Sequence, residues 1–164
     1  MANPKYVAAA LKRALAIYSA LPEPPDILRI DTYPGETTDA QTASALRRAG
    51  LHFPHERTKE LFTDEYGGTE LIEVCHSYWN LNAVDLAPEK LLREIILGDI
   101  GGRSVFVSSV YLLCSGTRVL YHLYDDRGLD IAAADKETIR PLYQKFNGWI
   151  LDYDRQAIDK TFAE

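Results

Sequence analysis

Three runs of β-branched and aromatic residues in the second half of the chain constrain its fold most strongly. They are SVFVSSVYLLC (104–114), RVLYHLYD (118–125) and LDIAA (129–133). Ser115-Gly116 interrupts the first pair of runs, and the segment DDRG (125–128) separates the second pair. Turns this short join neighbouring antiparallel strands, because a parallel pair needs a crossover of a dozen or more residues. The sequence therefore predicts an antiparallel meander.

Helical patterns surround this β-rich region. Asn3 is the expected N-cap of a first helix, which begins at Pro4 and carries apolar residues at three- and four-residue spacings. Gly50 is expected to end the second helix, and Gly98 to cap the third after its start near Pro88. Asp135 is expected to cap the fourth helix, which Pro141 would kink or delay. The predicted helices span about residues 4–20, 38–49, 88–97, 135–146 and 154–162.

Two further strands are predicted at residues 27–33 and 69–81. Together with the meander they indicate an α+β fold in which helices cover one face of a mainly antiparallel sheet. With 164 residues and neither repeats nor a linker, the chain is expected to form a single domain, residues 1–164. The first 85 or so residues are expected to hold helices and strands without further assignment.

Several classes of protein do not fit the composition. There is no run of about 18 apolar residues, so no membrane-spanning helix is expected. Two cysteines do not make a disulfide framework and four histidines are dispersed, so we expect no metal site and a cytoplasmic protein. A Gly-rich phosphate loop after a strand and a G-x-S-x-G elbow are both missing, and we expect no cofactor and no catalytic residues.

The formal charge of −6 arises from the middle of the chain, because residues 51–100 hold ten acidic and four basic residues. Direct binding of nucleic acid is not expected without a basic face. An acidic run with no basic residue extends from residue 60 to residue 73. Such a run suits a basic protein partner, although charge runs often serve only as solvated faces.

The segment Tyr121 to Ile131 (YHLYDDRGLDI) is the part of the chain most suggestive of acid–base chemistry. If Asp126 and Arg127 form a turn, residues 121, 123 and 125 share one strand face, and His122 points to the other. His122 and Asp125 would then not form a dyad, and the aspartates would serve the turn. The same alternation separates Cys75 from His76, and we expect Cys75 to pack in the core.

The C-terminal third, about residues 90–162, resembles a bacterial family of domains of unknown function. The matching segments are SSVY (108–111), YHLYDDRGLD (121–130), RPLY (140–143) and WILDYDR (149–155). The resemblance implies a structural signature rather than a reaction centre. That signature comprises Asp125, Asp126, Arg127, Gly128, Asp152, Asp154 and Arg155.

Members of that family are similar to immunity proteins of contact-dependent growth inhibition and polymorphic toxin systems. The resemblance implies a protein that binds a cognate toxin domain, such as a nuclease, and occludes its active site. The expected partner-binding residues are Glu60, Asp64, Glu65, Tyr66, Glu70 and Glu73. Two alternatives stay open: a small cytoplasmic hydrolase using Asp125, Asp126 and His122, and an adaptor without a toxin. The oligomeric state is left open.

Overall fold

The computed structural model describes residues 3–33, 39–63, 71–100 and 109–163. Its helices are α1 (Pro4–Tyr18), α2 (Asp39–Arg48), α3 (Pro88–Asp99), α4 (Lys136–Phe146) and α5 (Asp152–Ala163), with short 3-10 helices η1 (Leu81–Ala83) and η2 (Asn147–Trp149). Its strands are β1 (Ile27–Thr32), β2 (Glu56–Thr63), β3 (Leu71–Asn80), β4 (Ser109–Cys114), β5 (Val119–Leu123) and β6 (Leu129–Ala133). The α+β prediction is confirmed.

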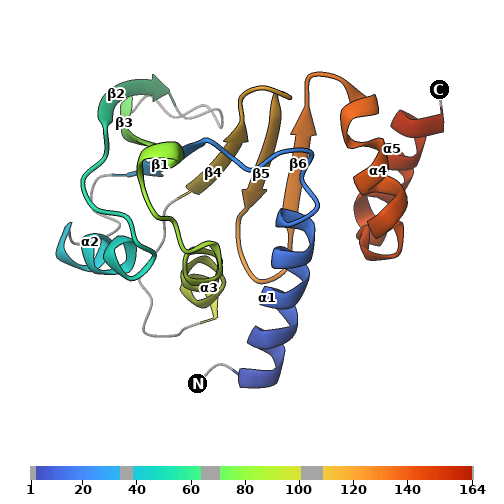
Figure 1. Cartoon of the computed structure of the whole chain (residues 1–164), viewed down its shortest axis with the longest axis horizontal. Helices are drawn as coiled ribbons and strands as arrows, with labels where there is room; N and C mark the ends of the chain where they lie inside the picture. The colour runs from blue at the N-terminus through green and yellow to red at the C-terminus, as the bar shows by residue number, and fades with distance from the viewer. Residues whose placement is uncertain (1–2, 34–38, 64–70, 101–108, 164) are drawn as a thin grey trace.

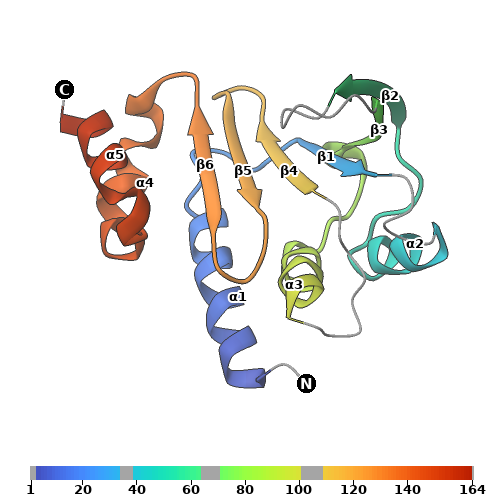
Figure 2. The same ribbon diagram turned by 180° about the vertical axis from the view of Figure 1, so that it is seen from behind.

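The six strands form one antiparallel sheet in the order β2-β3-β1-β4-β5-β6. The predicted meander of β4, β5 and β6 is confirmed. The N-terminal strand β1 lies in the centre and pairs with both β3 and β4. Helices α1, α2 and α3 lie on one side of the sheet, whereas α4 and α5 stand beyond its β6 edge (Figures 1 and 2).

The hydrophobic core lies between the sheet and α1, α2 and α3. Alternate residues of β4 and β5 point into it, as the burial of β5 shows: Val119, Tyr121 and Leu123 are buried and the residues between them are less so. The Tyr121 hydroxyl donates a 3.1 Å hydrogen bond to the Ala14 carbonyl, which fixes β5 against α1. The other sheet face, called the far face below, carries the residues between these core positions.

Helix boundaries follow the predicted capping chemistry in most places. The Asn3 side chain accepts a hydrogen bond from the Lys5 amide at 3.0 Å, and Asp135 accepts one from the Glu137 amide at the same distance. Gly50 ends α2 with a φ of 86°, and the next amide, Leu51 N–H, donates back to Leu46 O at 2.9 Å in a Schellman arrangement.

The structure departs from the predicted local structure in three places. Gly98 does not cap α3, which continues through Asp99. Pro141 lies inside α4, which begins directly after its Asp135 cap, so the start of the helix is not delayed. Strand β2 was not foreseen, because its sequence ERTKELFT is rich in charged residues. An edge strand tolerates such residues, since one side of it has no strand to pair with.

Candidate functional site

The segment from Asp125 to Gly128 forms a closed turn between β5 and β6. Asp125 is only 7% exposed, and its Oδ1 accepts hydrogen bonds from the amides of Arg127 (2.7 Å) and Gly128 (3.2 Å). The Arg127 guanidinium donates to Oδ2 at 2.9 Å through Nε. Burial alone would raise the pKa of Asp125, but these hydrogen bonds outweigh it and lower the pKa. Asp126 accepts a 2.6 Å hydrogen bond from the Tyr6 hydroxyl of α1.

His122 lies on the far face, away from Asp125. Its ring packs against Tyr111 with centroids 4.3 Å apart and contacts Tyr124 edge-on at 5.7 Å. Burial lowers the pKa of His122, which favours the neutral ring, while Asp130 and Asp31 act in the opposite direction. Its Nε2 atom is buried and has no hydrogen-bond partner in the described part of the chain.

The structure separates the two described members of the acidic run. Glu60 on β2 shares the far face with His76, and its Oε2 lies 3.2 Å from His76 Nε2. Glu73 on β3 points to the opposite face, where the Lys59 ammonium donates to it at 2.9 Å. Asp64, Glu65, Tyr66 and Glu70 lie outside the described residues.

The C-terminal signature residues tie α5 to the segment before it. The Arg155 guanidinium donates to the backbone carbonyls of Asn147 (3.0 Å) and Ile150 (3.1 Å). It also lies 4.0 Å from Asp152, whose side chain is fully exposed. Asp152 and Asp154 stand in the first turn of α5, where the helix dipole favours negative charge.

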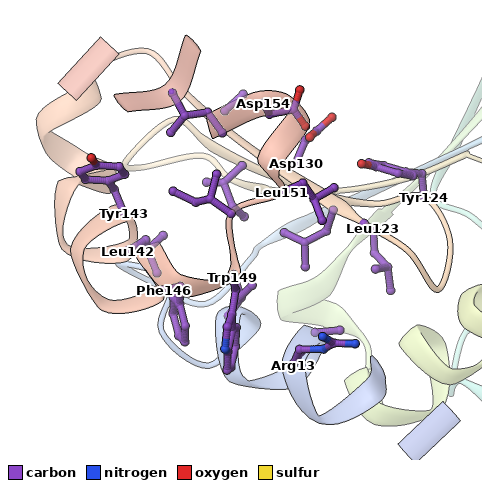
Figure 3. Close-up of a pocket in the computed structure, with 18 of the residues that line it drawn as sticks. Arg13, Leu123, Tyr124, Asp130, Leu142, Tyr143, Phe146, Trp149, Leu151 and Asp154 are labelled. Atoms are coloured by element: carbon purple, nitrogen blue, oxygen red, sulfur yellow. The ribbon is translucent and has the colours of Figure 1, made fainter. Parts of the chain in front are cut away.

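A cavity of about 690 Å³ lies beside β6, between α1, the β5–β6 hairpin and the pair α4–α5 (Figure 3). Its wall is mainly apolar and includes Leu123, Leu142, Phe146, Trp149 and Leu151. Phe146 and Trp149 stack with centroids 5.0 Å apart. Asp130 and Asp154 add two carboxylates to the wall.

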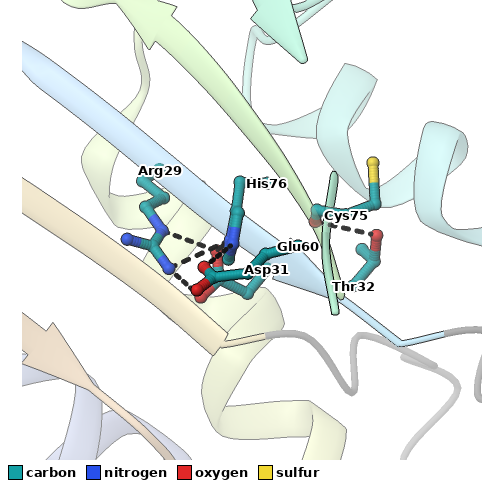
Figure 4. Close-up of polar contacts among 6 residues, drawn as sticks. All are labelled: Arg29, Asp31, Thr32, Glu60, Cys75 and His76. Atoms are coloured by element: carbon teal, nitrogen blue, oxygen red, sulfur yellow. Dashed lines mark hydrogen bonds and ion pairs between the residues drawn. The ribbon is translucent and has the colours of Figure 1, made fainter. Parts of the chain in front are cut away.

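A second polar group, centred on Asp31 and called the Asp31 cluster, lies on the far face of the central strands (Figure 4). The Arg29 guanidinium makes a two-pronged contact with Asp31, through Nε (2.7 Å) and Nη2 (2.8 Å). His76, opposite Asp31 on β3, places Nδ1 2.7 Å from the Asp31 Oδ1. The fourth member, Glu60, reaches the other ring nitrogen of His76 as described above.

Hydrogen bonding in the Asp31 cluster fits either tautomer of His76. Protonated Nδ1 donates to Asp31, whereas unprotonated Nδ1 accepts from Arg29 Nη2, which lies 2.9 Å away. Burial of Asp31 raises its pKa, but hydrogen bonds from Arg29 and His76 outweigh that effect and lower it. The hydrogen bond to Asp31 also raises the pKa of Arg29. The cluster is therefore a satisfied charge network on the far face.

The cluster adjoins a line of side chains that crosses five strands, called the cross-strand row. Arg29 lies opposite Tyr78 on one side and opposite Tyr111 on the other. Its guanidinium carbon is 5.6 Å from the centre of the Tyr111 ring. Tyr111 stacks on His122, and His122 lies opposite Asp130 on β6. The row thus comprises Tyr78, Arg29, Tyr111, His122 and Asp130, and its last member also lines the cavity.

Sequence reasoning identified His122 but missed the rest of the cross-strand row. One signal was available in ILRIDT (27–32), where Arg29 and Asp31 alternate with Leu28 and Ile30. Two opposite charges at a spacing of two share one strand face and can pair. The strand order that joins this face to β4 and β5 was not available from the sequence.

No helix of the described residues is both long and apolar enough to cross a bilayer. The same residues contain no group of three or more histidine, cysteine or acidic side chains arranged to hold a metal ion.

Comparison with known proteins places the chain in a family. Residues 1–154 match the domain of unknown function DUF3885, so the chain belongs to this family. A relative, the uncharacterized protein YnaE of Bacillus subtilis strain 168, is 36% identical over 53 residues. That segment is 32% of this chain and 25% of YnaE, so the match spans about a quarter of the relative. No solved structure matches.

Proposed function

We propose that this member of the DUF3885 family is an immunity protein, which binds a cognate toxin domain in the bacterial cytoplasm and covers its active site. The observation that carries the proposal is the cross-strand row. An arginine, two tyrosines and a histidine follow one another across four neighbouring strands of the far face, with side-chain contacts between Arg29 and Tyr111 and between Tyr111 and His122.

The chemistry of the row supports a protein-binding role. Tyrosine and arginine are enriched among the residues that dominate binding energy at protein interfaces. The Arg29 side chain is 39% exposed, and Tyr124, which contacts His122, is 43% exposed. Arg29 is also pre-positioned by Asp31, which lowers the conformational entropy that binding would cost.

The charge of the molecule indicates a basic partner. The net charge is −6, and the 68% exposed Glu60 stands on the same face as the row. A basic toxin domain would be attracted to this face at long range. A nuclease fits this description, because carboxylates of the inhibitor would occupy positions that nucleic-acid phosphates take in its active site.

The hydrolase alternative has less support. It requires His122 to act with Asp125 or Asp126, yet His122 stacks on Tyr111 while Asp125 is held by Arg127 and Gly128. Asp126 is bound by Tyr6. The adaptor alternative would use the same surface, and only the identity of the partner separates it from immunity.

The first test is a pull-down of the tagged chain from its own bacterium, with mass spectrometry of the eluate across a salt gradient. The proposal expects a stoichiometric partner that is the C-terminal domain of a large secreted protein and that dissociates as salt rises. Expressing that domain should arrest growth, and co-expression of this chain should restore it. Recovery of the chain alone at low salt, or a partner that is not toxic, would count against immunity.

The second test addresses the surface. Tyr111→Ala should weaken binding by about 2 kcal/mol or more, the threshold of an interface hot spot. Tyr153→Ala is the matched control, because Tyr153 is an exposed tyrosine on α5, away from the row. Thermal melts of both variants check folding. Equal affinity of Tyr111→Ala and the control would remove the cross-strand row from the interface.

A further inference from the structure

The cavity beside β6 is a feature that toxin binding does not require. Its volume of about 690 Å³ falls within the range of roughly 300–1,000 Å³ that is usual for small-molecule sites. Its lining includes residues of β5, of the β5–β6 turn and of β6, and α4, η2 and α5 supply leucine, isoleucine and aromatic side chains. Such a wall favours the apolar body of a ligand.

Two carboxylates give the cavity a polar end. Asp130 from β6 and Asp154 from α5 lie at the Tyr124 side of the cavity (Figure 3). Burial raises the pKa of the Tyr124 phenol, and the negative charges of Asp130, Asp125 and Asp154 raise it further. All three carboxylates are therefore close enough to the Tyr124 ring to influence its ionisation electrostatically. Within the described residues, the side-chain carboxylates of Asp130 and Asp154 accept no hydrogen bond and form no ion pair.

The other charges around the cavity have partners or stand elsewhere. Arg127 pairs with Asp125. The Lys136 ammonium, which donates to the Thr161 carbonyl at 3.1 Å, follows the end of β6 that is remote from the β5–β6 turn. Arg13 projects from α1 on the opposite side of the cavity from Asp154 (Figure 3). The uncompensated charge at the Tyr124 end is therefore negative.

We propose that this cavity binds a small amphipathic cation, that is, a molecule with an apolar body and one ammonium group. The apolar body lies among Leu123, Leu151 and Trp149. The ammonium group lies at Asp130 and Asp154, where the Tyr124 ring adds a cation–π contact. This inference does not depend on the immunity proposal, because it concerns a different class of ligand and the helices α4 and α5, and only Asp130 and Tyr124 border both sites.

The test compares three probes that share a dodecyl chain: dodecylamine, dodecanol and dodecanoate. Each is titrated into the full chain at pH 7, below its micelle concentration, by calorimetry and by tryptophan fluorescence. Trp149 lines the cavity whereas Trp79 is buried in the core, so Trp149→Phe assigns the fluorescence change. Dodecylamine should bind about fivefold more tightly than dodecanol, the scale of a partly exposed ion pair, and dodecanoate should bind most weakly.

Variants locate the charge recognition. Asp130→Asn with Asp154→Asn should abolish the preference for dodecylamine over dodecanol while both still bind. Asp152→Asn is the matched control, since this carboxylate is on the same helix but fully exposed and outside the cavity. The proposal is overturned if no probe binds saturably, if dodecanoate binds best, or if the control variant loses the preference equally.

Discussion

Individual residues of the far face show how buried polar groups are accommodated in this fold. Asp31 is buried, and both of its oxygens accept hydrogen bonds from Arg29. His122 is the opposite case, because its Nε2 atom is buried without a partner in the described residues. The two residues should therefore respond differently to substitution and to pH.

Asp31→Asn should destabilise the protein by about 2 kcal/mol at pH 7, because charge-assisted hydrogen bonds are lost and Arg29 is left unpaired. The folded-state pKa of Asp31 is below its ordinary value of 3.8. The stability that the carboxylate contributes is therefore fully present above pH 3.8 and is lost as the pH falls through the lower, folded-state pKa. Urea unfolding from pH 7 to pH 3 should show that the difference in unfolding free energy between wild type and variant shrinks below pH 3.8. A difference that stays constant to pH 3 would contradict this account, and Asp152→Asn is the neutral control.

His122→Phe should preserve or increase stability, because it removes an unsatisfied buried nitrogen and keeps an aromatic ring on Tyr111. The folded-state pKa of His122 is below 6.5. The unfolded chain therefore binds the proton more readily, and the wild type loses stability as the pH falls from 6.5 toward the folded-state value. In urea unfolding at pH 7, 6 and 5, the free energy of unfolding of the variant should rise relative to that of the wild type as the pH falls through that window. His52→Gln, which changes an exposed loop histidine, should show no gain; a less stable His122→Phe at pH 5 would refute the argument.

At the scale of elements, local chemistry predicts where most of the helices begin and end. The caps at Asn3, Gly50 and Asp135 follow from backbone geometry that neighbouring residues alone determine. Gly98 is the exception, since the buried Ile95 and Ile96 keep α3 packed on the core and the helix runs past the glycine. Strand β2 lacks a periodic apolar signal, and its existence depends on pairing with β3.

Gly50→Ala tests the end of α2. A Cβ at this position would be strained at φ 86° and would overlap the backbone carbonyl oxygen of Asp85, which cannot move aside as a side chain could. The substitution should cost about 1–3 kcal/mol of unfolding free energy, measured by urea denaturation. Gly148→Ala is the control, because a Cβ there meets no atom within 4 Å. Equal stability of the two variants would contradict this description of the turn.

At the scale of the whole molecule, function depends on an arrangement that the sequence does not display. Strand β1 enters the sheet between β3 and β4, which brings Arg29 between Tyr78 and Tyr111. Alternation in each strand predicts which residues share a face, but the order of strands is decided by long-range packing. This is why the sequence predicted the turn at Asp125–Gly128 and could not predict the cross-strand row.

The same long-range packing divides the molecule into parts of unequal stability. Every residue of the main buried cluster lies between Val7 and Leu123, on the sheet, on α1, α2 and α3, or directly after α2 at Ala49 and Leu51. In the pair α4–α5 only Leu142 is buried, and α5 contributes no buried residue. Contacts such as the stacking of Tyr143 on Phe162 hold these helices mainly to each other. We therefore expect α4 and α5 to open together without unfolding the sheet.

Native-state hydrogen exchange measures directly whether α4 and α5 open together. Amides of α4 and α5 should exchange with one shared opening free energy, below that of the amides in β1 and β4. Leu142→Ala should lower the protection of both helices and leave that of β1 unchanged, whereas Leu92→Ala, in the main cluster, should lower protection throughout. Because α4 and α5 form one wall of the cavity, dodecylamine should raise their protection selectively. If the amides of α4 are as protected as those of β1 in the free protein, the molecule unfolds as one unit instead. The cavity would then be a fixed part of the core rather than a site formed by a separately stable pair of helices.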